Sequence, residues 1–105
     1  MSDLETTIAL LEALVAFPTI SSDSNMDAIT FLAGHLERSG ARVEVLRDAS
    51  GQKANLWATL GPEIDGGLVL SGHSDVVPVA EQDWSSDPFV MTRRNGRLYG
   101  RGTCD

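Results

Sequence analysis

The chain has 105 residues, of which 42% are hydrophobic, and this is enough to form the core of one small globular domain. Its net charge of −7 argues against a nucleic-acid partner, because nucleic acids are bound by basic surfaces. The single cysteine, Cys104, excludes an internal disulfide, and the acidic N-terminus resembles neither a signal peptide nor a membrane span. These features predict a cytoplasmic protein that does not bind a membrane.

Two helices are predicted in the first forty residues. Apolar side chains recur at helical spacing in the first segment, where Ser2 or Asp3 is the expected cap and Pro18 ends the helix. The second helix has Ser24 or Asn25 as its expected cap and closes at Gly40.

Strands are predicted for the rest of the chain. Apolar and polar residues alternate over residues 42–47, which predicts a half-buried strand, and residues 54–60 predict a second strand after a turn. The continuously apolar run Leu68–Leu70 predicts a third strand, covered on both faces. Asn95-Gly96 predicts a tight hairpin near the end of the chain. Two helices followed by strands indicate an α/β fold, and no change in composition marks a second domain.

Polar residues that could bind a ligand directly follow the predicted third strand. His73 and Asp75 lie two residues apart, so their side chains point to the same side of an extended segment. The carboxylate could hold one imidazole nitrogen while the other nitrogen binds a metal, or both residues could be metal ligands. The end of a buried strand in an open α/β sheet is a usual place for ligands.

A second candidate region ends in Asp105, after the glycines at positions 100 and 102. Taken alone, Gly-x-Gly indicates only a tight turn. We expect Trp84 and Phe89 to pack the loop under the site, with contact to a substrate as the alternative. Arg101 is expected to pair with a carboxylate that holds the loop, and binding of a substrate carboxylate is the alternative. Cys104 is expected to be a small buried hydrophobic residue rather than a metal ligand.

Four sequence blocks resemble a known family of hydrolases. They occur in the family's order and spacing: 70–78 (Leu-Ser-Gly-His-Ser-Asp-Val-Val-Pro), Trp84, Pro88-Phe89, and 96–105 (Gly-Arg-Leu-Tyr-Gly-Arg-Gly-Thr-Cys-Asp). The pattern is similar to that of the co-catalytic zinc deacylases and aminoacylases, loosely over the whole chain and closely over residues 68–105. The resemblance implies that residues 1–105 are the N-terminal part of a zinc-peptidase-like catalytic domain, two helices and then strands, with an incomplete sheet.

The resemblance also implies a role for three residues. His73 would be a ligand to one of two zinc ions, and Asp105 would bridge both ions. Asp75 would be a catalytic residue that holds the imidazole of His73 and raises its basicity. Cobalt can replace zinc in this family. Its general-base glutamate, its other ligands and its dimerising lid domain would lie beyond Asp105, so we expect residues 1–105 alone to be inactive.

The function that the resemblance implies is hydrolysis of the amide bond in a small N-acylated amino acid. N-acetylornithine is the expected substrate, in arginine biosynthesis, and N-succinyl-diaminopimelate is the alternative. The full-length protein is expected to be a homodimer. A hypothesis of another class is a non-catalytic module that binds metal or associates with itself, because an open sheet edge invites pairing with another chain.

Overall fold

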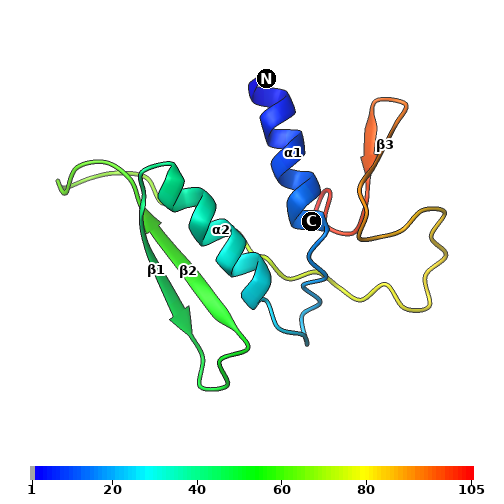
Figure 1. Cartoon of the computed structure of the whole chain (residues 1–105), viewed down its shortest axis with the longest axis horizontal. Coiled ribbons are helices and arrows are strands. Elements are labelled where there is room, and N and C mark those ends of the chain that lie inside the picture. The colour runs from blue at the N-terminus through cyan, green and yellow to red at the C-terminus, as the bar shows by residue number, and fades with distance from the viewer. Residues whose placement is uncertain (1) are drawn as a thin grey trace. The chain divides into compact units, whose positions relative to one another are not determined.

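The computed structural model describes residues 2–105, and these divide into two compact units (Figure 1). One unit contains the chain up to Ser22 together with Val76–Asp105, and the other contains Asp23–Asp75. Each unit has one helix and one antiparallel pair of strands. No helix in the described part of the chain is long and apolar enough to cross a membrane.

Helix α1 spans Asp3–Val15 and begins as predicted. The side chain of Ser2 accepts a hydrogen bond from the backbone N–H of Glu5 at 3.2 Å, which satisfies one of the N–H groups left over at a helix start. Val15 at the other end is buried. A Cβ on Gly100 would lie only 3.0 Å from Val15 Cγ1, so the end of α1 packs closely against the backbone of residue 100.

Helix α2 spans Met26–Arg38, and both of its ends agree with the prediction. Ser24 Oγ accepts a hydrogen bond from the Met26 N–H at 3.2 Å. At the other end Gly40 has a φ of 93°, a left-handed conformation that glycine adopts without strain. The Ala41 N–H reaches back to the Leu36 carbonyl at 3.0 Å, the bond that defines a Schellman ending.

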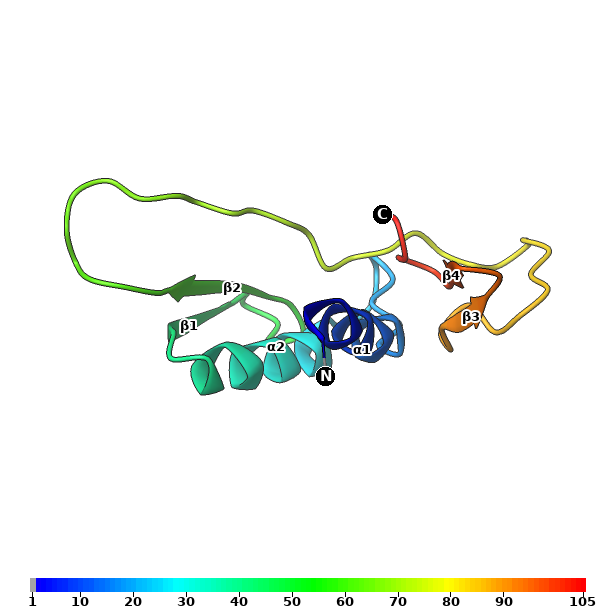
Figure 2. The same cartoon turned by 90° about the horizontal axis from the view of Figure 1, so that it is seen from above.

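Strands β1 (Arg42–Arg47) and β2 (Ala54–Thr59) form an antiparallel hairpin in the same unit as α2. Helix α2 covers one face of this hairpin (Figure 2). The side chain of Asn25, just before α2, exchanges two hydrogen bonds of 2.9 Å with the backbone of Ala54. An asparagine amide thus acts here like the backbone of a neighbouring strand, and it joins the start of the helix to β2.

The predicted third strand at Leu68–Leu70 is wrong. No residue of this run belongs to a strand, and Leu68 and Leu70 are 85% and 86% exposed. A strand requires a neighbour for its backbone, and within residues 2–105 both sheets are two-stranded hairpins that leave this run out. The α/β class is confirmed, but the single sheet expected from the sequence is replaced by two separate pairs of strands.

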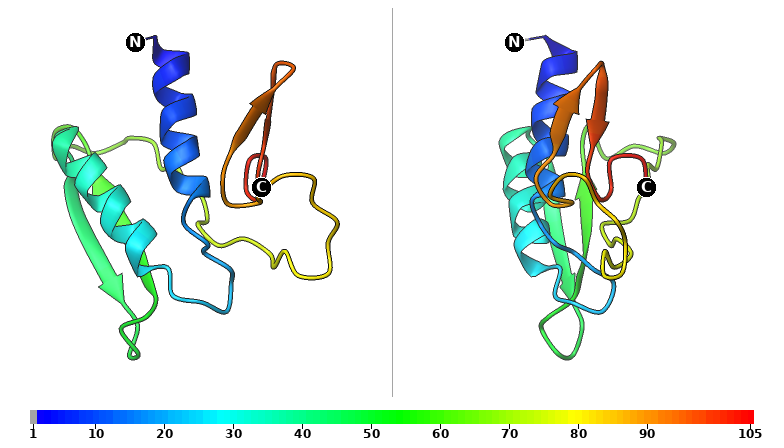
Figure 3. Two further views of the ribbon diagram at one scale, coloured as in Figure 1. Left: turned by 45° about the vertical axis from the view of Figure 1, so that its right-hand side comes forward. Right: turned by 90° about the vertical axis from the view of Figure 1, so that its right-hand side faces the viewer.

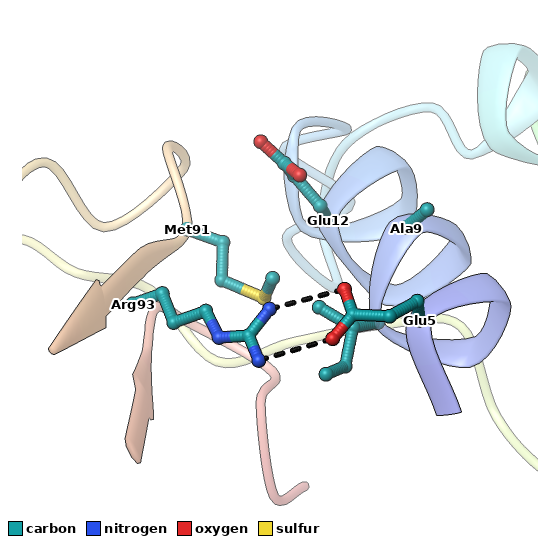
Figure 4. Close-up of a pocket in the computed structure, with 6 residues that line it drawn as sticks. Glu5, Ala9, Glu12, Met91 and Arg93 are labelled. Carbon is teal, nitrogen blue, oxygen red and sulfur yellow. Dashed lines mark hydrogen bonds and ion pairs between the residues drawn. The ribbon is translucent and has the colours of Figure 1, made fainter. Parts of the chain in front are cut away.

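The predicted hairpin at Asn95-Gly96 is confirmed. Strands β3 (Thr92–Arg94) and β4 (Arg97–Tyr99) pair around it, with a φ of 54° at Asn95 and 72° at Gly96. Positive φ at both central residues is what a type I′ turn requires. The hairpin lies beside α1 (Figure 3). Arg93 in β3 donates two hydrogen bonds of 3.2 Å to the carboxylate of Glu5 in α1, beside a hollow lined partly by Met91 (Figure 4).

Gly34, which lies within α2, and Gly40, which follows it, provide a matched test of the helix end. Gly34 lies inside the helix, where alanine is expected to stabilise the protein by about 0.5–1 kcal/mol, since the new Cβ meets only the flexible end of Arg38. Gly40→Ala forces a left-handed conformation on alanine and is expected to destabilise by about 1–2 kcal/mol. Chemical denaturation of both variants measures the difference. Equal effects of the two substitutions would contradict the assigned helix end.

The Glu5–Arg93 ion pair predicts a pH dependence of stability. Hydrogen bonding from Arg93 lowers the pKa of Glu5 from its ordinary value of 4.5. The contribution of the pair to stability is therefore complete above about pH 4.5 and is lost as the pH falls through the lowered pKa. Glu5→Gln should lower the melting temperature at pH 7 by more than it does at pH 2.5. Glu12→Gln, on the same exposed helix face, is the control; a loss at pH 7 equal to that of Glu5→Gln would refute the pair's role.

Candidate metal site

His73 and Asp75 lie in an exposed, irregular segment at the end of the unit Asp23–Asp75. Their side chains are 60% and 50% exposed. The sequence predicted that they would follow a buried strand, and this context is absent because Leu68–Leu70 forms no strand. The pair is nevertheless brought together, as the two-residue spacing predicted.

Asp75 contacts the imidazole of His73 at Nδ1. Nδ1 lies 2.9 Å from the backbone carbonyl oxygen of Asp75 and 3.1 Å from its Oδ1. Both oxygens are acceptors, since a carbonyl and an ionised carboxylate have no proton to donate. Nδ1 is therefore the protonated nitrogen, and in the neutral ring the lone pair resides on Nε2.

This tautomer suits a metal ligand. Zinc binds the neutral imidazole through one ring nitrogen, and the other N–H commonly meets a carboxylate or a backbone carbonyl. Asp75 offers both kinds of oxygen to the same N–H. Of the two arrangements that the sequence left open, this geometry favours Asp75 as the residue that orients His73. Within residues 2–105, no group of three or more His, Cys, Asp or Glu side chains gathers to hold a metal ion.

Asp105 lies in the other unit, after a tight turn at residues 100–103. Thr103 closes the turn, because its N–H and its hydroxyl both donate to the Gly100 carbonyl, at 3.3 and 3.0 Å. Gly102 has a φ of 94°, and a Cβ there would lie 3.2 Å from Val76 Cγ1. The left-handed conformation thus favours glycine at position 102, and a larger residue would also have to displace Val76 slightly. Because His73 and Asp105 belong to different units, the site they would form together stays a prediction.

Two expectations about the residues around Asp105 are wrong. Cys104 is exposed, not buried, because the chain leaves the packed turn at Thr103. Among residues 2–105, Arg101 pairs with no carboxylate: its Nη2 donates to the Pro78 carbonyl and to Gln82 Oε1.

Arg101 also lies over the ring of Trp84, 5.2 Å from the ring centroid. Trp84 and Phe89 are half-buried, as expected for residues that pack a loop. Gln82, which contacts both Arg101 and Trp84, was not identified from the sequence. A glutamine within a polar loop belongs to no pattern that would have distinguished it.

Known proteins are similar to the chain over 93–100% of its length. It is 42% identical to the acetylornithine deacetylase of Pasteurella multocida, over 100% of the chain and 29% of that protein. It is 44% identical to the acetylornithine deacetylase of Edwardsiella ictaluri, over 99% of the chain and 29% of the relative. With the succinyl-diaminopimelate desuccinylase of Bordetella petrii the identity is 46%, over 93% of the chain and 25% of the relative.

The chain therefore spans between 25% and 29% of the length of these three relatives. Residues 69–105, which contain His73, Asp75 and Asp105, match the profile of the peptidase family M20/M25/M40. This match and the likeness over the whole chain agree with the resemblance inferred from the motifs. The chain is therefore similar to the peptidase family M20/M25/M40 over residues 69–105, and to part of each of these three longer relatives over its own length.

Proposed function

We propose that the full-length protein is a metal-dependent amide hydrolase that removes an acyl group from the α-nitrogen of a small amino acid. One observation carries the proposal: Asp75 holds Nδ1 of the exposed His73, so that Nε2 is the nitrogen able to bind a metal. N-acetylornithine is the proposed substrate, since two relatives are named acetylornithine deacetylases.

Two residues of this chain are proposed to hold the metal. His73 offers a neutral nitrogen and Asp105 a carboxylate that can bridge two cations, both of which are donors that zinc accepts. The proposed site contains two zinc ions, which cobalt can replace, and its remaining ligands and general base lie outside residues 1–105. The chemistry that such ions supply is polarisation of the acyl carbonyl and activation of water.

Asp75 is proposed to act through His73. By accepting a hydrogen bond from the Nδ1–H it fixes the plane of the imidazole and makes Nε2 a better electron-pair donor to a metal. Its negative charge also stabilises the partial positive charge that the ring gains when Nε2 binds a cation. His73 supplies the bond to the metal, and Asp75 determines the direction and strength of that bond.

Other functions remain as alternatives to deacetylation of N-acetylornithine. Desuccinylation of N-succinyl-diaminopimelate uses the same chemistry and is favoured by the likeness to the Bordetella petrii enzyme. A non-catalytic module that binds metal or associates with itself is the alternative of another class, favoured by the exposed apolar run at Leu68–Leu70. A cytoplasmic location and a homodimer are also proposed for the full-length protein.

Assays of the full-length protein on both amides test the function. With zinc or cobalt supplied, we expect turnover of N-acetylornithine and a loss of about 10–100-fold in kcat/KM for Asp75→Ala, the usual effect of removing a residue that orients a ligand histidine. His73→Ala and Asp105→Ala should lose more, because they remove ligands. The control is Cys104→Ala, which alters an exposed neighbour of Asp105. Failure to hydrolyse either amide would refute the proposal.

The tautomer of His73 can be measured in the 105-residue chain without metal. Nitrogen-15 NMR of the imidazole at pH 8 should show the proton on Nδ1 for His73. Asp75→Ala removes the Oδ1 acceptor, and we expect the population to shift toward the Nε2–H tautomer. His35 in α2 is an internal control that should not change. An Nε2–H tautomer in the unaltered chain would contradict the proposed role of Asp75.

A further inference from the structure

A loop that begins at Pro78 and ends at Pro88 is fastened to Arg101 at both ends. The Arg101 side chain donates from Nη2 to the Pro78 carbonyl oxygen at 3.3 Å. The backbone N–H of the same residue donates to the Pro88 carbonyl oxygen at 2.7 Å. Both contacts lie within the unit that contains α1 and Asp105. One residue thus determines the separation of the two ends of this loop.

The middle of the loop is held by the same side chain. The guanidinium of Arg101 lies over the ring of Trp84 and donates to Gln82 Oε1. Trp84 Nε1 donates to that same oxygen at 3.0 Å. Gln82, Trp84 and Arg101 therefore form a closed triangle, the Arg101 cluster. A planar guanidinium can stack on a ring and donate from its edge at once, and a lysine ammonium cannot.

Stability alone does not account for this use of a charged residue. Arg101 Nε is buried and has no hydrogen-bond partner within residues 2–105. Burying a donor that makes no hydrogen bond destabilises a folded protein. An apolar side chain would pack the loop without that cost, but it would lack the directional contacts of the guanidinium. The Arg101 cluster therefore provides orientation rather than packing.

The turn that leads to Asp105 starts at the Arg101 cluster. Gly102 lies against Val76, and Val76 is held by hydrogen bonds with Thr19 and Ser21 of 2.9 and 3.1 Å. Thr103 closes the turn on the Gly100 carbonyl. The backbone is thus held from residue 100 to residue 103, and only Cys104 separates it from Asp105.

We propose that Arg101 is a positioning residue for the metal-bridging carboxylate of Asp105. Arg101 binds the Pro78–Pro88 loop and forms part of the turn. It thereby determines the direction of the backbone that carries Asp105. The inference rests on the proposed metal role of Asp105. It adds to that role a residue that has no contact with the metal and acts through the backbone.

The full-length protein loaded with cobalt tests the inference, because the visible absorption of cobalt reports the geometry of its ligands. Arg101→Lys keeps the charge and removes the planar guanidinium. Gln82→Ala, at an exposed position, removes the oxygen that accepts hydrogen bonds from both Arg101 and Trp84. For both variants we expect a changed cobalt spectrum, a cobalt affinity lowered about tenfold or more, and a shifted NMR signal of the Trp84 indole N–H. Arg94→Lys is the matched control, since Arg94 also stacks on a ring, that of Tyr99, but lies outside the cluster.

The outcomes separate this inference from the proposed function. If the unaltered protein binds cobalt and loses it in Asp105→Ala, the metal role of Asp105 holds. A shifted Trp84 signal in Arg101→Lys and Gln82→Ala would show that the cluster is disturbed. If the cobalt spectra and affinities of these variants were nevertheless unchanged, only the positioning role of Arg101 would be overturned. Cobalt binding that does not depend on Asp105 would overturn both. If Arg101→Lys fails to fold, Gln82→Ala still decides.

Discussion

The backbone bridge between Ile20 and Val76 is the contact on which the arrangement around Asp105 depends. The Val76 N–H donates to the Thr19 carbonyl at 2.9 Å, and the Ser21 N–H donates back to the Val76 carbonyl at 3.1 Å. Thr19 is buried, so the bond that its carbonyl accepts is shielded from water, which makes that bond stronger and its loss more costly. Val76 in turn packs against Gly102, where an added Cβ would lie only 3.2 Å from Val76 Cγ1. A bridge of two hydrogen bonds thereby joins the loop after α1, the residue after Asp75 and the turn before Asp105.

Contacts near in sequence build each half of the proposed site. His73 and Asp75 meet across two residues, and the turn before Asp105 closes across three. Such short-range contacts form without the rest of a large domain, because little chain entropy is lost in closing so small a loop. This explains how a chain that spans about a quarter of its relatives can hold both motifs in defined conformations. A complete metal site would also need ligands from more distant parts of the sequence. That His73 and Asp105 join such ligands in one site is the proposal.

The exposed apolar run at Leu68–Leu70, in contrast, depends on contacts with distant segments. Its side chains need a covering layer and its backbone needs neighbouring strands, and within residues 2–105 it has neither. An extended apolar segment of low charge with unpaired backbone groups is a template for another strand. The proposed self-association of the 105-residue chain would follow from this property. Either a second copy or a further segment of sheet would satisfy the same backbone groups.

Features that depend on neighbours in the chain were predictable from the residues alone. The Ser2 cap, the Gly40 helix end, the Asn95-Gly96 hairpin and the His73–Asp75 contact each follow from local conformational preferences, which act over a few residues. The state of Leu68–Leu70, the exposure of Cys104 and the partners of Arg101 were predicted wrongly. Each depends on which distant segment supplies a neighbouring strand, a layer that buries the side chain or a hydrogen-bond acceptor. Composition and spacing do not identify that segment. Only the folded chain brings Gln82 and Trp84 to Arg101, because they approach it across a loop that no local rule closes.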